Sequence, residues 1–178
     1  MTQAKLDSAL GSLVDRSAAI AVVGLLSVQE VDRMRIAQAR VLRWIKGADR
    51  SPLVSYVAEG SWVADLSGRD PGETALVFLE SLSASDLDER GPLRNRPHLR
   101  VVPAALASQR LWQLSGDGMG WMPCRYMHGR YHAVVWRTEL SIARTLTHAP
   151  APRPWRDLAD AVPLNELLDA ICVRIGQR

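Results

Sequence analysis

Cys124, His128 and His132 are spaced four residues apart, an array of side chains that can bind zinc. A structural zinc site needs roughly four nitrogen or sulfur ligands in a tetrahedron. On a strand, positions four apart share a face, but Gly129 is expected to turn the chain between the two histidines. No fourth ligand stands nearby, so the more ordinary interpretation is a pair of histidines at strand ends. We predict neither a bound metal nor any other cofactor.

A Gly-x-Gly-x-Gly stretch begins at Gly116 and could suggest phosphate binding. Phosphate-binding loops of this kind lead into a helix whose N-terminus presents amides to the anion. Here the stretch leads into Trp121-Met122-Pro123, which does not start a helix. Asp117-Gly118 is instead typical of a tight turn, and it predicts a β-hairpin between strands at 110–114 and 120–125.

Residues that could act as nucleophiles lack the surroundings that catalysis requires. The chain has no Gly-x-Ser-x-Gly elbow, and its only cysteines, Cys124 and Cys172, form no Cys-x-x-Cys pair. Aspartates and glutamates are scattered, and no spacing selects a catalytic pair. We therefore expect a protein that is not an enzyme.

Composition indicates one soluble globular domain with an adequate core. The chain has 178 residues, of which 47% are hydrophobic and 23% are charged. The net charge is only +3, and the arginines are spread along the chain, which argues against a nucleic-acid partner. The longest apolar run, residues 18–26, is shorter than the roughly 20 residues that span a bilayer. We predict no membrane span.

Hydrophobic periodicity predicts a few helices and several strands along the chain. Residues 83–97 are polar and charged, with Gly91, Pro92 and Pro97, and are expected to form an exposed loop. The proline-rich residues 148–154 predict a stiff connector. The expected elements are a helix at 3–14, strands at 17–24, 53–57, 74–82 and 131–136, and a last helix after Pro163.

Residues 28–46 allow two interpretations. Ser27 and Glu30 form a capping-box pattern, and apolar residues that begin at Met34 follow one helical face. Alternatively, the first strand continues to Glu30, turns near Asp32 and Arg33, and returns as a strand with a bulge near Gln38. Periodicity alone slightly favours the helix.

Four segments in a fixed order decide between these interpretations through a resemblance. They are a strand ending near Gly24, then residues 41–47 (VLRWIKG), 72–79 (GETALVFL) and 116–123 (GDGMGWMP). This order resembles the bacterial OB-like barrels related to the tissue-inhibitor-of-metalloproteinases and netrin modules. The resemblance covers roughly residues 17–136, and the helix after Pro163 is similar to the tail of some members. It implies that residues 34–45 form a strand.

The resemblance does not extend to metalloprotease inhibition. Inhibitors of that superfamily ligate the zinc of their target with an N-terminal cysteine, whereas this chain starts Met1-Thr2-Gln3 and has no cysteine before Cys124. Members of the group are often exported, and two separate cysteines suit a cytoplasmic or an extracytoplasmic protein equally.

Together these features predict a mainly β fold, an OB-like barrel of five or six strands with a short N-terminal helix and a C-terminal helix. The expected parts are the N-terminal helix at 1–16, the barrel at 17–147, and the proline-rich connector with the C-terminal helix at 148–178.

OB folds bind their ligands on the face of strands 2 and 3, often by aromatic stacking in a basic groove. The residues that these strands would supply are Arg40, Arg43, Trp44, Tyr56 and Trp62. The competing interpretation places Trp44 and Tyr56 in the barrel core or under the terminal helix, because buried aromatic residues dominate core packing.

We therefore expect a non-catalytic protein-interaction module, with binding of single-stranded nucleic acid as the alternative. The resemblance, the lack of catalytic motifs and the charged loop at 83–97 favour a protein partner. The sequence leaves the oligomeric state open.

Overall fold

Five strands close into a barrel in the computed structural model, which describes residues 8–31, 34–47, 50–58, 70–82, 110–116, 120–136 and 146–176. The strand order is β1-β2-β3-β5-β4, and β4 pairs back with β1 to complete the closure. All pairs in the barrel are antiparallel except β3 with β5. The predicted OB-like barrel is confirmed. Its strands are β1 (Ala19–Val31), β2 (Met34–Lys46), β3 (Leu53–Val57), β4 (Thr74–Ser81) and β5 (Leu111–Leu114).

Within the ambiguous stretch, residues 28–31 and 34–46 form strands, and the second of these is the strand that the resemblance implied. β1 and β2 pair from Ile20 opposite Lys46 to Val31 opposite Met34. The expected bulge near Gln38 is present, and its extra residue is Leu26, on the opposite strand. Tertiary pairing overrides the helical periodicity here, because β1 and β2 pair with each other along their length and each has a second partner along part of it.

β4 is buried on both faces, as its apolar run predicted. Ala75, Val77 and Leu79 point into the barrel core. Leu76 and Phe78 point outward into a second core, which lies between the barrel and the two helices. β4 therefore contributes to both cores.

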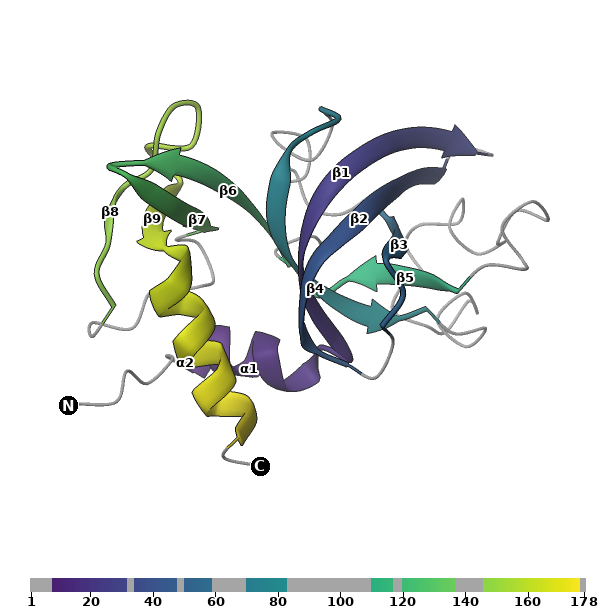
Figure 1. Cartoon of the computed structure of the whole chain (residues 1–178), viewed down its shortest axis with the longest axis horizontal. Coiled ribbons are helices and arrows are strands. Elements are labelled where there is room, and N and C mark those ends of the chain that lie inside the picture. Colours follow the sequence, from purple (N-terminus) through teal and green to yellow (C-terminus); the bar gives the residue numbers. More distant parts are fainter. Residues whose placement is uncertain are drawn as a thin grey trace.

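A second group of strands extends the sheet away from the barrel (Figure 1). They follow β4 in the order β6-β7-β9-β8. His128 and Gly129, both with positive φ of 50° and 79°, form the tight turn that joins β6 to β7. These strands are β6 (Trp121–Met127), β7 (Arg130–Trp136), β8 (Ala149–Pro150) and β9 (Ala159–Pro163).

The predicted hairpin around Asp117-Gly118 is wrong. In the described part of the chain, β5 and β6 do not pair with each other. Both run antiparallel to β4 along the same edge, β6 beside Thr74–Val77 and β5 beside Leu79–Ser81. Gly120 makes this arrangement possible, because a Cβ there would lie 2.7 Å from the Phe78 carbonyl oxygen. The local turn preference thus yields to the long-range pairing with β4.

The two predicted helices are present, and they cover the second core. α1 (Ser8–Arg16) ends later than expected, and α2 (Leu164–Gly176) starts directly after Pro163. Arg174 of α2 donates two hydrogen bonds to the Asp15 carboxylate of α1, at 3.1 and 2.6 Å. Lys46 donates to the last carbonyls of α1, those of Val14 and Asp15, at 2.8 and 3.2 Å. Neither helix is long and apolar enough to cross a bilayer. The loop predicted at 83–97 lies outside the described residues.

Candidate binding surfaces

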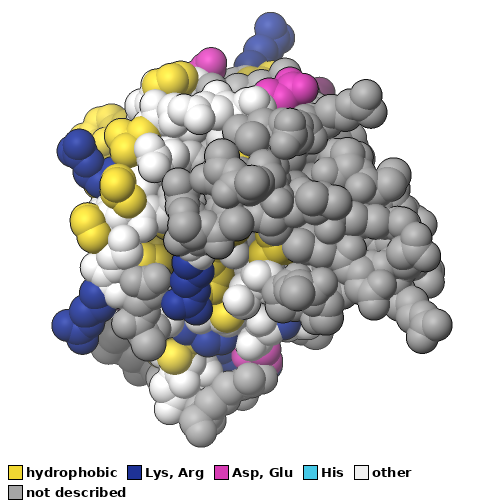
Figure 2. Space-filling model, turned by 90° about the vertical axis from the view of Figure 1, so that its right-hand side faces the viewer, with side chains coloured by type: hydrophobic (Ala, Val, Ile, Leu, Met, Phe, Trp, Pro, Cys, Tyr) yellow, Lys and Arg dark blue, Asp and Glu magenta, His cyan; other side chains and the backbone are white. Residues whose placement is uncertain are grey.

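The outer surface of β1, β2 and β3 carries exposed leucines beside arginines. Arg40 lies directly opposite Gly24 on β1 and Leu53 on β3. Leu42 is 56% exposed, Leu53 is 44% exposed and Leu26 is 39% exposed. Figure 2 views the molecule from the barrel side and shows hydrophobic side chains next to lysine and arginine side chains along its left border. We call this surface the leucine–arginine face; its residues are Leu26, Arg40, Leu42, Arg43 and Leu53.

An irregularity in strand pairing adds an arginine to this face. The small residues Ala37 and Ala39 point into the barrel, so Arg40 and Leu42 point outward by strand alternation. A register shift occurs here, in which Val41 pairs with Val23 and Arg43 pairs with Val22. Leu42 is the extra residue, and both it and Arg43 are exposed. The bulge therefore exposes Arg43 beside Leu42, whereas strict alternation would turn Arg43 toward the barrel.

The two arginines of this face are available to a partner. Among the described residues, neither Arg40 nor Arg43 makes an ion pair or a side-chain hydrogen bond. An exposed arginine with free donors can pair with a carboxylate in two parallel hydrogen bonds. The face can thus recognise an anion next to an apolar group.

The aromatic residues predicted for this surface are placed differently. Tyr56 is 1% exposed and lies in the barrel core, with its ring 6.0 Å from that of Trp121. Trp44 is half-buried against the same core, and its indole N–H donates to the Ser51 carbonyl at 3.1 Å. Trp62 lies outside the described residues. The structure therefore brings Arg40 and Arg43 to a common surface and places Tyr56 beneath it.

Among the described residues, the buried Tyr56 hydroxyl has no hydrogen-bond partner, and the same holds for the indole N–H of Trp121. Burial raises the pKa of Tyr56 well above its usual value, and the negative charge of Glu73 raises it further. The phenol is therefore neutral in the folded protein throughout the physiological range.

The three metal candidates do not converge. Cys124 pairs with Ala133 and His132 pairs with Arg125, so these two side chains point to opposite faces of the β6–β7 ribbon. Burial raises the pKa of Cys124 to about 12, which keeps it a thiol, and His128 is exposed on the turn. In the described residues, no three side chains of histidine, cysteine, aspartate or glutamate gather as a metal site would require.

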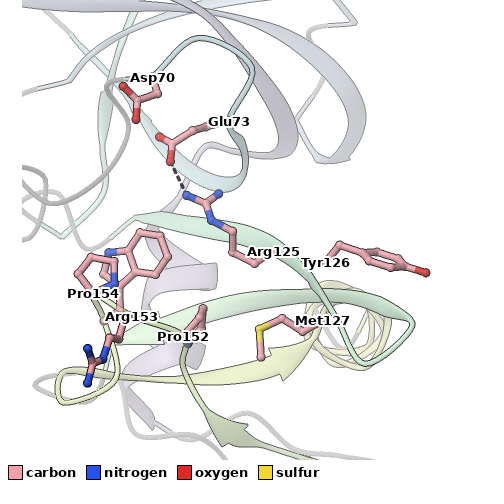
Figure 3. Close-up of a pocket in the computed structure, with 9 residues that line it drawn as sticks. Asp70, Glu73, Arg125, Tyr126, Met127, Pro152, Arg153 and Pro154 are labelled. Carbon is pink, nitrogen blue, oxygen red and sulfur yellow. Dashed lines mark hydrogen bonds and ion pairs between the residues drawn. The ribbon is translucent and has the colours of Figure 1, made fainter.

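A pocket of about 520 Å³ lies between the barrel and the second group of strands (Figure 3). Its walls come from three distant segments: the turn before β4, the end of β6 and the loop before β9. Figure 3 shows Glu73 and Arg125 pointing toward each other, while the side chain of Arg153 points away from this pair. The residues that line it are Asp70, Glu73, Arg125, Tyr126, Met127, Pro152, Arg153, Pro154 and Trp155.

The positive charge of Arg125 in this pocket is neutralised by the carboxylate of Glu73. Arg125 donates to the Glu73 carboxylate at 2.5 Å and to the Cys124 carbonyl at 3.2 Å. Its guanidinium also lies 4.8 Å from the centre of the Trp155 ring. These contacts join the barrel to the loop before β9. Residue patterns do not reveal this pocket, because its segments are far apart in the chain and the prolines at 152 and 154 predict only a stiff connector.

Fold and surface together define a closed OB-like β-barrel, extended by a second sheet region and two helices. No protein-family model matches the chain, and no curated protein matches it.

Proposed function

We propose that the chain is a non-catalytic protein-interaction module and that its partner binds on the leucine–arginine face. The observation that carries this proposal is the pair of exposed leucines on β2 and β3, Leu42 and Leu53, beside two arginines without described partners. OB barrels bind their ligands on the outer side of strands 2 and 3, which is where these residues lie. Arginine is enriched among the residues that dominate protein interfaces, and a group of exposed apolar side chains often marks an interaction site.

A protein partner suits this face better than a single-stranded nucleic acid does. Nucleic-acid binding of this kind depends on bases stacking on exposed aromatic rings. Tyr56 offers no ring face to solvent, and Trp44 is half-buried with its N–H bonded to Ser51. Leucines supply apolar area without a stacking surface, so they favour a protein side chain.

We also propose a distant relationship to the tissue-inhibitor-of-metalloproteinases and netrin modules. The closed barrel, followed by a C-terminal helix, supports this proposal. The N-terminal cysteine mechanism of the inhibitors is not part of it.

Affinity capture from the native host tests the proposed function. We expect the wild-type chain to recover a stoichiometric protein partner, and the double variant Leu42→Ser/Leu53→Ser to lose it. Tyr131→Ser is the matched control, because Tyr131 is also about half exposed (51%) but lies on β7, away from this face. A chain that remains alone under all conditions would contradict the proposal, as would capture that the double variant leaves unchanged.

Titration of labelled single-stranded oligonucleotides tests the alternative. Binding at about 50 mM salt that weakens steeply with added salt and is lost in Trp44→Ala would favour a nucleic-acid partner. We expect no such binding.

A further inference from the structure

Gly24 interrupts the side-chain layer of the leucine–arginine face. It lies inside β1, between Val23 and Leu25, where a glycine is less favourable than an alanine. A Cβ at this position would meet only one described atom within 4 Å, Cδ1 of Leu42 at 4.0 Å, which is ordinary van der Waals contact. The fold therefore has room for a side chain here, unlike at Gly120.

A glycine that the backbone and the packing do not require often marks a place where another molecule approaches closely. The described atom nearest a Cβ at this position belongs to the exposed side chain of Leu42, and we call the side-chain-free surface at Gly24 the Gly24 gap. Arg40 borders it directly, because Arg40 and Gly24 are cross-strand partners. An apolar side chain and an exposed arginine thus flank the Gly24 gap.

We propose that the Gly24 gap receives an apolar side chain from an extended acidic segment of the partner protein, and that a carboxylate of the same segment pairs with Arg40. This inference rests on the proposed function. In an extended segment, residues i and i+2 face the same side and are about 7 Å apart. Cross-strand neighbours such as Gly24 and Arg40 are about 5 Å apart, and the arginine side chain can reach the remaining distance.

Charge complementarity selects this occupant over a second copy of the chain. A symmetric contact through this face would bring Arg40 and Arg43 of one copy against the same arginines of the other. Like charges that face each other across an interface are unfavourable, whereas a carboxylate gains charge-assisted hydrogen bonds. The segment should therefore carry glutamate or aspartate two residues from its leucine.

Backbone amide shifts in ¹⁵N-labelled protein test this inference with synthetic peptides. The acidic probe is an extended, serine-spaced peptide with a central leucine and glutamates two residues to either side. One control peptide replaces the glutamates by lysine, and a second replaces the leucine by serine. We expect only the acidic leucine peptide to shift the amides of Gly24, Leu26, Arg40 and Leu42.

Two variants test separately the role of the Gly24 gap and the role of Arg40 in peptide binding. Gly24→Val places a side chain in the gap, and its Cβ makes only ordinary contact with Leu42, so we expect the fold to stay as stable or become more stable, while peptide affinity falls at least about tenfold. Arg40→Gln should weaken the acidic peptide and remove the preference over the lysine peptide. Arg156 is an exposed arginine outside this face, so Arg156→Gln should change neither the affinity for the acidic peptide nor the preference over the lysine peptide.

The inference is overturned if the acidic peptide causes no shifts at millimolar concentration, shifts other residues, or binds Gly24→Val as well as wild type. If Leu42→Ser/Leu53→Ser nevertheless abolishes partner capture, only the acidic segment is wrong and the proposed binding face stands. If capture is also unaffected, both are wrong.

Discussion

Removing the buried hydroxyl of Tyr56 should make the protein more stable. The substitution Tyr56→Phe keeps the ring in the barrel core and deletes only the oxygen, which has no hydrogen-bond partner. A buried polar group without a partner costs about 1–3 kcal/mol of desolvation that no hydrogen bond offsets. Most substitutions of a buried residue destabilise a protein, so an increase in stability would set Tyr56→Phe apart from them.

The expected gain is about 2 kcal/mol in the free energy of unfolding. For a chain of this length, each kcal/mol shifts the melting temperature by roughly 2–4 °C, so Tm should rise by about 4–8 °C. The ring contact with Trp121 is retained, because the hydroxyl is not part of it. The substitution removes only one heavy atom, so the free-energy cost of the cavity that it leaves is much smaller than the cost of removing a whole side chain.

Urea unfolding followed by tryptophan fluorescence measures this change, with unchanged m-values as the condition for comparing midpoints. Tyr131→Phe is the control, because that tyrosine is 51% exposed and its hydroxyl can contact water; we expect a change within about 0.5 kcal/mol. A Tyr56→Phe protein that is less stable than wild type by about 1 kcal/mol would refute the reasoning. It would mean that the hydroxyl has a partner, such as an ordered water, in the barrel.

Three further measurements follow from burial and packing. At pH 8 a thiol reagent should modify Cys172, which is exposed, while buried Cys124 should react only after unfolding; two equally fast thiols would contradict the packing of β6. The pKa of Cys124 is raised from 9.0 to about 12, so its contribution to stability is complete below pH 9 and is lost as the pH rises toward 12, by up to about 4 kcal/mol. Cys124→Ala should flatten that decline in alkaline unfolding curves, and an unchanged slope would exclude this thiol as its cause. Gly120→Ala should cost about 3 kcal/mol or more, because its Cβ would lie 2.7 Å from the Phe78 carbonyl oxygen, while Gly24→Ala should be neutral or stabilising; similar melting temperatures for the two variants would refute this difference.

Local sequence patterns correctly predicted those elements whose burial matches their own hydrophobic pattern. The run at 74–82 is apolar at successive positions, and β4 indeed contacts a core on each face. The apolar stripe after Pro163 gave α2 for a similar reason, because one side of that helix packs and the other faces water. Periodicity alone failed for residues 28–46, where pairing with β1 and β3 decides the structure.

The candidate surface was only partly visible in the sequence. The sequence points to Arg40 and Arg43, but the exposure of Arg43 beside Leu42 depends on a bulge that no residue type predicts. The pocket around Arg125 was not visible at all, because its walls come together only when β6 and the loop before β9 reach the turn before β4. Asp117-Gly118 misled for the opposite reason: its turn preference is strong, but β4 offers the following residues a partner that is distant in sequence.

The position of β4 has a consequence for how the molecule opens. One of its edges pairs with β1, the other with β6 and β5, and its two faces belong to different cores. Neither core can lose its packing without exposing one face of this strand. The barrel and the helical side should therefore unfold together in a single cooperative step, and the β4 amides should be the last to exchange their hydrogens with solvent.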